Sequence, residues 1–310
     1  MHLIASRSPD HDVTNTVDVT SSAAVYRAVR DLLVLRFPKL PFAKLKRAFQ
    51  DFDRLYSGQY PGFHACDTAY HDACHVRDVT LAMARLIDGH EVTHGPKDSI
   101  GHRLALVGLV VALFHDAGYI RRKGDTRHSN GAAYTRTHVS RSARFLVEYL
   151  PTIGLGSEAD MAARMVHYTG YEMAPDAIVL SSNKAHLVGH LVGTADVIAQ
   201  MADVAYLEKC RDHLYQEFEI GGIARQQAED GSELVIYESA VDLLVKTPGF
   251  VESVIEQRLD GYFDAAYRFA EAHFGGNNLY MEALMANRRR LEAALSASAQ
   301  RDCVLFDLAV

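Results

Sequence analysis

The stretch LALVGLVVALFHDAGY, residues 104–119, decides the fold because an apolar run ends abruptly in the polar pair His115-Asp116. The run is too short before His115 to span a bilayer, so it predicts a buried helix that carries a site at its end. Burying a carboxylate such as Asp116 costs several kcal/mol unless a metal ion or an ion partner compensates it. The alternative is a helix end that reaches solvent with an ordinary surface histidine and aspartate.

Helical periodicity continues on both sides of this stretch, with apolar residues at intervals of three and four. It covers residues 23–37, 42–57, 71–87, 131–150, 160–168, 185–218 and most of 239–298. The fragment LVIY, residues 234–237, is the one convincing strand-like segment. We therefore expect an all-α protein with a flexible N-terminal arm over residues 1–20 and a single helical catalytic domain over residues 21–310.

The composition of the chain limits the classes of partner that it is expected to bind. The chain has 310 residues, 48% of them hydrophobic, and a net charge of −7, which opposes attraction to polymeric nucleic acid or an acidic membrane and favours a small substrate. Four cysteines without CxxC spacing, and a start without a basic segment followed by a long apolar run, lead us to expect a cytoplasmic protein. The amphipathic last third could pack on the core or on a second subunit, so the oligomeric state stays open.

Histidine is unusually frequent, with sixteen residues. We expect surface positions for His2, His11, His90, His94 and His273. His71 and His75 are four residues apart and should share one helix face. His138, His167 and Asp196 lie in helical segments whose apolar face would otherwise continue, and imidazoles and carboxylates are the usual protein ligands of Fe, Mn and Zn.

The order of these side chains resembles the HD superfamily, in its version with two metals in one helical core. The residues in question are His75, His115-Asp116, His138, His167 and Asp196. The resemblance implies an HD-domain helical bundle that holds two divalent metal ions (Fe, Mn, Zn or Mg). It implies that His75, His115, Asp116 and Asp196 hold the first metal, with Asp116 bridging. It assigns the second metal to His138 and His167.

A closer resemblance is to the class I cyclic-nucleotide phosphodiesterases, over roughly residues 70–260. It is carried by Tyr70-His71-Asp72-Ala73-Cys74-His75-Val76-Arg77-Asp78-Val79, Ala195-Asp196, Asp212, Glu217-Phe218, Gly222 and the run from Lys246 to Phe250. By that likeness His71 is the general acid, and a hydroxide between the metals, held partly by the catalytic Asp116, attacks the phosphorus.

The chain also departs from both families. Thr247 replaces the glutamine that reads the purine, Tyr119 replaces the lysine of the HD-GYP dinucleotide phosphodiesterases, and no Gly-Tyr-Pro follows His167. The extra imidazoles His138 and His167 are similar to those of two-iron branches of the superfamily, which include oxygenases.

The function expected is therefore a metal-dependent phosphodiesterase acting on a cyclic nucleotide or another small phosphoester. A two-iron oxygenase and an inactive metal or nucleotide sensor are the alternatives. Substrate contacts are expected from Asn130, Thr247 and Phe250. Phosphate could also meet the basic loop Arg121-Arg122-Lys123, Arg136 or Arg141, although a charged run is usually a solvated face.

Overall fold

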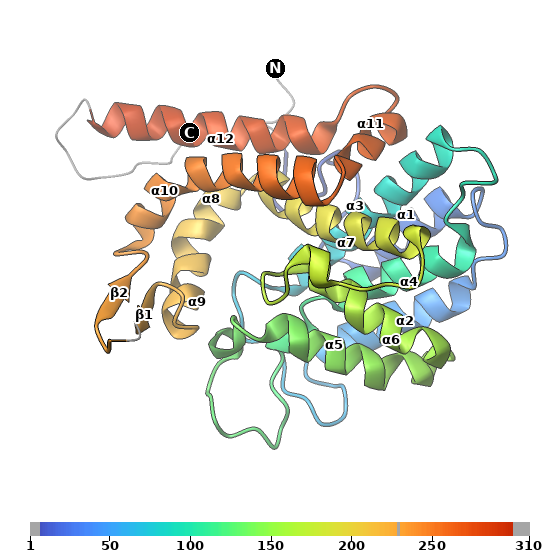
Figure 1. The fold of residues 1–310 in the computed structure, drawn as a ribbon, viewed down its shortest axis with the longest axis horizontal. Coiled ribbons are helices and arrows are strands. Elements are labelled where there is room, and N and C mark those ends of the chain that lie inside the picture. The colour runs from blue at the N-terminus through green and yellow to red at the C-terminus, as the bar shows by residue number, and fades with distance from the viewer. Residues whose placement is uncertain (1–6, 228–229, 300–310) are drawn as a thin grey trace.

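The computed structural model describes residues 7–227 and 230–299, and it confirms an all-α fold. The longer helices are α1 (Ser22–Leu33), α2 (Phe42–Tyr56), α3 (Ala73–Thr93), α4 (Gly101–Phe114), α5 (His138–Tyr149), α7 (Asn183–Ala202), α10 (Ala240–Ser253) and α12 (Leu279–Ala299). Shorter helices are α6 (Ala159–Met165), α8 (Tyr206–Lys209), α9 (Tyr215–Ile220) and α11 (Phe269–Phe274). Figure 1 shows α12 lying along one edge of the molecule beside α10.

Helices α3, α4 and α7 form the centre of the fold. Every residue of α4 from Ala105 to Phe114 is buried, as its all-round apolar sequence predicts. Gly108 lets α4 approach its neighbours, because a Cβ there would lie 2.6 Å from Met83 Cε on α3 and 2.7 Å from Val188 Cγ1 on α7. The three helices that carry His75, His115 and Asp196 are therefore packed against one another.

Two further segments flank this centre near the site. Helix α5 follows the short 3₁₀ turns η1 (Ala117–Tyr119) and η2 (Gly131–Tyr134), and η5 (Val166–Thr169) follows α6. Segment η5 contacts α7, and α5 contacts α4 and the turn η1 that follows it. His138, the first residue of α5, comes within 3.8 Å of Asp116, whereas His167 lies in η5.

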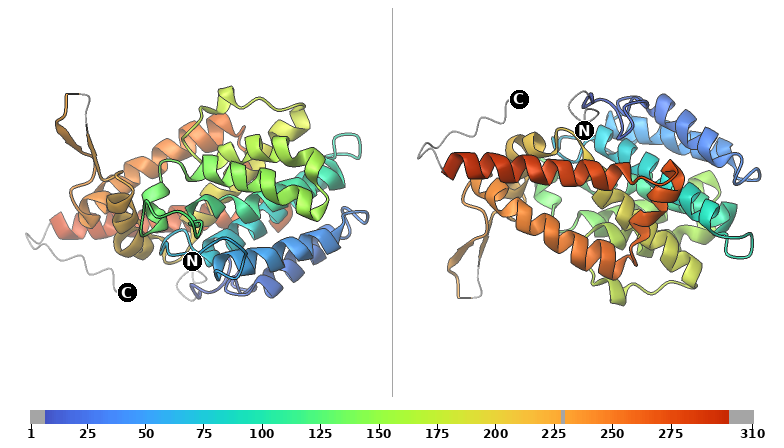
Figure 2. Two further views of the ribbon diagram at one scale, coloured as in Figure 1. Left: turned by 90° about the horizontal axis from the view of Figure 1, so that it is seen from below. Right: turned by 90° about the horizontal axis from the view of Figure 1, so that it is seen from above.

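The chain beyond α7 departs from regular α-helix. Residues Cys210–Leu214 and Val254–Tyr262 are π-helical, and β1 (Arg225–Gln227) pairs antiparallel with β2 (Glu233–Val235). The hairpin projects from the helical body in both views of Figure 2. The predicted strand at 234–237 is present in part, because β2 ends at Val235.

Residues 7–20 differ from the flexible arm expected for residues 1–20, of which residues 1–6 lie outside the described part. Asp12 is fully buried, and its carboxylate lies 2.5 Å from Nη2 of Arg85 on α3. His11 and Asp18 form a β-bridge, and Arg77 donates to the carbonyl of Val19. A sequence without regular apolar spacing hid this packing, because a buried ion pair and single valines such as Val19, not a periodic apolar face, hold the segment.

Three of the five histidines expected at the surface are partly or fully buried, namely His11, His90 and His273, whereas His94 is exposed and His2 lies outside the described residues. His90 is buried, and its ring stacks on that of His94 with centroids 4.2 Å apart. His273 donates from Nδ1 to Asp88 at 2.8 Å. Among the described residues, none of the helices combines the length and the apolar character needed to traverse a lipid bilayer.

Candidate metal centre

His115 and Asp116 lie where α4 ends, and both are almost completely buried, with 1% and 2% of their surface exposed. A helix end that reaches solvent is thereby excluded. His115 donates from Nδ1 to the carbonyl of Ala112 at 2.8 Å, which leaves Nε2 to face Asp116 Oδ2 at 3.2 Å. A backbone carbonyl that fixes the ring in this way is the usual support of a metal-binding histidine.

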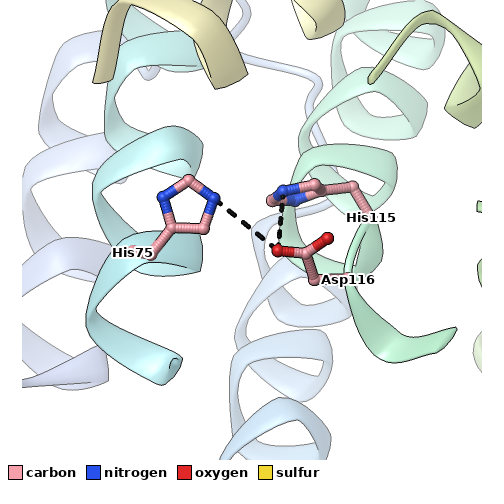
Figure 3. A group of neighbouring side chains, drawn as sticks. All are labelled: His75, His115 and Asp116. Carbon is pink, nitrogen blue, oxygen red and sulfur yellow. Dashed lines mark ion pairs between the residues drawn. The ribbon is translucent and has the colours of Figure 1, made fainter. Parts of the chain in front are cut away.

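His75 approaches the same carboxylate oxygen from α3, as Figure 3 shows. Its Nε2 lies 3.6 Å from Asp116 Oδ2, and the ring stands in the first turn of α3. Asp72 caps this helix, because its side chain accepts from the backbone N–H of His75 at 2.8 Å. The cap determines where the helix begins and therefore the place of His75.

Asp196 approaches both imidazoles from α7, although it lies outside the set formed by His75, His115 and Asp116, whose donor atoms are all within 4.8 Å of one another. Its Oδ1 lies 3.4 Å from Nε2 of His75 and 3.4 Å from Nε2 of His115. Metal–ligand bonds of about 2.0–2.2 Å at tetrahedral or right angles separate neighbouring donors by about 2.8–3.6 Å. The separations between these imidazole nitrogens and carboxylate oxygens, 3.2–3.6 Å, therefore fit the edges of one coordination shell.

Three of these buried atoms have no hydrogen-bond partner among the described residues: His75 Nε2, His115 Nε2 and Asp116 Oδ2. Buried polar atoms without partners are rare and costly in folded proteins. A cation at the point where they converge would satisfy all of them. The residues present thus fit a divalent metal ion of the Fe, Mn or Zn type.

The electrostatics of the group favour a cation as well. Burial disfavours the charged forms of Asp116 and Asp196, yet the His115 imidazole outweighs burial and holds the pKa of both carboxyl groups well below the ordinary value. The two carboxylates conversely raise the pKa of His115, against the effect of burial. Two buried carboxylates thus keep their negative charge and attract positive charge to the space between them.

His138 lies on the other side of Asp116. Its Nε2 is 3.8 Å from Asp116 Oδ1, whereas Oδ2 faces His75 and His115, so the two oxygens of Asp116 point to two sets of imidazoles. His138 donates from Nδ1 to the carbonyl of Thr135 at 2.7 Å, and burial lowers its pKa. The ring is therefore neutral near pH 7, with Nε2 as the free electron-pair donor.

His167 is not brought to hydrogen-bond or ion-pair distance of this group among the described residues. It lies in η5, its buried Nδ1 has no hydrogen-bond partner there, and burial lowers its pKa. The side chain is thus neutral and unsatisfied, but its role as a ligand stays a prediction.

His71 lies beside the group without joining it. Its Nδ1 is 2.6 Å from Oε2 of Glu217, whose Oε1 accepts from the backbone N–H of Tyr70 at 2.6 Å. Burial lowers the pKa of His71, but the hydrogen bond to Glu217 and the charge of Asp116 outweigh it and raise the pKa above its ordinary value. The ring is therefore oriented and biased towards the protonated form.

Tyr119 is the aromatic partner of both flanking imidazoles. Its ring stacks on His71 with centroids 4.3 Å apart and on His138 at 4.4 Å, with interplanar angles of 19° and 18°. The hydroxyl lies 3.5 Å from His71 Nε2. The sequence identified Tyr119 only as a departure from a family pattern, and nothing in its spacing indicated this stacking.

These groups open into a cavity of about 690 Å³. His71, Asp116, His138 and Asp196 line it, and the rest of the wall is largely aromatic and apolar, with Tyr171, Phe218, Tyr237 and Phe250 among its residues. A volume of this size suits a small organic ligand. Thr247 and Phe250, two of the predicted substrate contacts, line the cavity, and Phe250 is 43% exposed.

Two of the predicted substrate contacts, Thr247 and Asn130, already form hydrogen bonds within the protein. Thr247 already donates to the carbonyl of Leu243 at 2.8 Å, so its hydroxyl is engaged within α10. Asn130 does not line the cavity: its amide donates to the carbonyl of Asp67, and its Oδ1 caps η2 at Ala132. Asn130 therefore shapes the loop after the metal group.

Most of the predicted basic residues are engaged elsewhere. Arg121 pairs with Asp67 and Arg122 with Glu148, and Arg141 donates to the carbonyl of Gly118. Arg136 lines the cavity and donates to the carbonyl of Gly222 at 2.5 Å.

Comparison of the chain with protein-family models, curated proteins and solved structures found no match. The case for the site consequently depends on its own geometry.

Proposed function

We propose that this protein is a metal-dependent phosphodiesterase that hydrolyses a small phosphoester, with His71 as general acid and with the metal held by His75, His115, Asp116 and Asp196. The observation that carries the proposal is the His71–Glu217 pair, 2.6 Å apart, at the wall of the cavity that also contains Asp116 and Asp196. An imidazole held by a carboxylate beside a metal site is suited to protonating a leaving oxygen.

A bound divalent ion would polarise the phosphoryl group and lower the pKa of a coordinated water. The protein residues supply the rest. His75, His115 and Asp196 would bind the first ion, and Asp116 would share its two oxygens between that side and His138. Glu217 would hold His71 in the protonated form so that Nε2 donates to the departing oxygen, and the aromatic wall would bind the organic part of the substrate.

The test is an assay of cyclic and linear phosphodiesters after anaerobic purification and metal analysis. We expect turnover without oxygen, and we expect His71→Ala to lower kcat about 100-fold or more while metal content is retained. Asp116→Ala should lose both metal and activity. The matched control is His102→Ala, because His102 is exposed on α4 away from the cavity.

Three outcomes would overturn the proposal. Strict dependence of product formation on oxygen and iron would make the protein an oxygenase. Loss of metal in His71→Ala would contradict the role of His71 as an acid distinct from the ligands. Absence of turnover on the whole panel, with metal bound, would favour the sensor.

A further inference from the structure

Arg258 is a buried cation in the wall of the cavity. It lies in the π-helical segment Val254–Tyr262 and is 6% exposed. π-Helical turns are rare and occur frequently at functional sites, since they displace a side chain from its regular α-helical position. Here the turn directs a guanidinium to the same cavity as Asp116 and Asp196.

The contacts of Arg258 are to neutral groups. Nη1 donates to the carbonyl of Gly170 at 3.1 Å and Nη2 to the carbonyl of Tyr168 at 2.6 Å. The guanidinium also lies over the rings of Tyr171 and Phe263, 4.3 and 5.2 Å from their centroids. These partners orient the group but leave its charge unneutralised.

Arg258 forms no ion pair with a carboxylate of the described residues: its hydrogen bonds go to backbone carbonyls, and its buried Nε has no hydrogen-bond partner there. Lys246, a second cation of the cavity, differs because it pairs with Asp242 at 2.7 Å. An unpaired charge in a buried position is costly, and buried charges in proteins ordinarily have a counter-charge.

We propose that Arg258 binds a second anionic group of the substrate, a phosphate or a carboxylate, at a distance from the reacting phosphorus. This inference rests on the proposed function for the identity of the reacting group and adds the substrate class: a phosphoester that carries another anion. A guanidinium suits such a group because its N–H donors match the oxygens of phosphate and carboxylate in pairs.

A structural role is the competing explanation, since Arg258 also joins the carbonyls of Tyr168 and Gly170. Removal of a purely structural Arg258 would loosen this loop and weaken every ligand of the cavity alike. Removal of an anion-binding Arg258 would weaken only ligands that carry the second anion. The ratio of two affinities therefore separates the two roles.

The experiment is isothermal titration calorimetry with three probes: adenosine 5′-monophosphate, adenosine 3′,5′-bisphosphate, and the monophosphate bearing a succinyl group on the base nitrogen. We expect the wild-type protein to bind at least one of the doubly anionic probes about 10-fold or more tightly than the monophosphate. The probe preferred distinguishes phosphate from carboxylate.

Arg258→Gln should abolish this preference without changing the Kd of the monophosphate, and Arg258→Lys, which keeps the charge, should retain part of it. The control Lys246→Gln should keep the full preference, because Asp242 already neutralises Lys246. Equal weakening of all three probes in Arg258→Gln, or no preference in the wild-type protein, would overturn the inference. Absence of phosphodiesterase turnover with the preference intact would instead contradict only the proposed function.

Discussion

Asp116 divides its two oxygens between His75 and His115 on one side and His138 on the other. The sequence indicated Asp116 as a candidate metal ligand because a carboxylate that ends an apolar run is costly without a cation, and the metal itself stays a prediction. It did not predict Glu217 as the partner of His71, although a resemblance drew attention to the residue. The two lie 146 positions apart, and no local spacing encodes a contact between α9 and the chain before α3.

Glu217 sets the acidity of His71, and this can be measured as a pH profile. Because the hydrogen bond to Glu217 raises the pKa of His71, Glu217→Gln should lower that pKa. A protonated general acid is lost as pH rises through its pKa, so the alkaline decline of kcat should begin at lower pH in the variant.

Metal content and the acidic side of the profile should be unchanged in Glu217→Gln. Glu219→Gln is the matched control, because Glu219 lies on the same helix but does not line the cavity. An unshifted alkaline decline would show that Glu217 does not govern the protonation of His71.

At the scale of elements, the helices were predictable and their irregular continuations were not. Apolar residues spaced three or four positions apart predicted α3, α4 and α7, because each of these helices buries a continuous surface. The π-helical segment around Arg258 has the same composition as ordinary helix, so its sequence predicts only helix. The contacts that Arg258 makes from this segment are to residues distant in the sequence, such as Tyr168 and Tyr171.

Helix α5 depends on a cap from elsewhere in the chain. Its own N-cap residue Thr137 makes no capping hydrogen bond, whereas Glu172 accepts from the backbone N–H of Val139 at 2.7 Å and of Ser140 at 3.1 Å. His138 is the first residue of this helix. Glu172 therefore holds the start of the helix that carries a candidate metal ligand.

Glu172→Ala should lower the free energy of unfolding by about 1 kcal/mol. Two backbone N–H groups lose their acceptor, and the N-terminus of the helix loses a favourable negative charge. The substitution should also displace His138 and so reduce the amount of metal bound per folded chain, beyond any loss caused by a larger unfolded fraction. Urea denaturation and elemental analysis test this. Glu148→Ala, near the other end of α5, should change neither quantity, and equal effects of the two variants would argue against the cap.

At the scale of the whole molecule, Arg85 on α3 links the N-terminal segment to the last helix, α12. Arg85 on α3 pairs with Asp12 at 2.5 Å and donates to the hydroxyl of Tyr280 on α12 at 2.8 Å. Asp12 also accepts from the backbone N–H of Thr14 and of Val17. This buried network connects the N-terminal segment, the central layer and the last helix.

The network makes stability dependent on pH in a definite direction. Burial raises the pKa of Asp12, but the charge of Arg85 and the hydrogen bonds from Thr14 and Val17 outweigh it and lower the pKa to about 2. A carboxyl whose pKa is lower in the folded state stabilises it above the unfolded value of about 3.9. That stabilisation, about 2–3 kcal/mol, is lost as pH falls from about 4 towards 2.

Asp12→Asn should therefore destabilise the protein at pH 7 by about 3–5 kcal/mol, because it leaves the buried charge of Arg85 without its partner. The difference between the variant and the wild-type protein should narrow by about 1 kcal/mol at pH 3, where the unfolded wild-type chain has already bound the proton. Urea denaturation at the two pH values measures this, with the exposed Asp10→Asn as the control. A difference that is the same at both pH values would mean that the charge of Asp12 does not hold the N-terminal segment on α3, and that its hydrogen bonds to Thr14 and Val17 carry the stability instead.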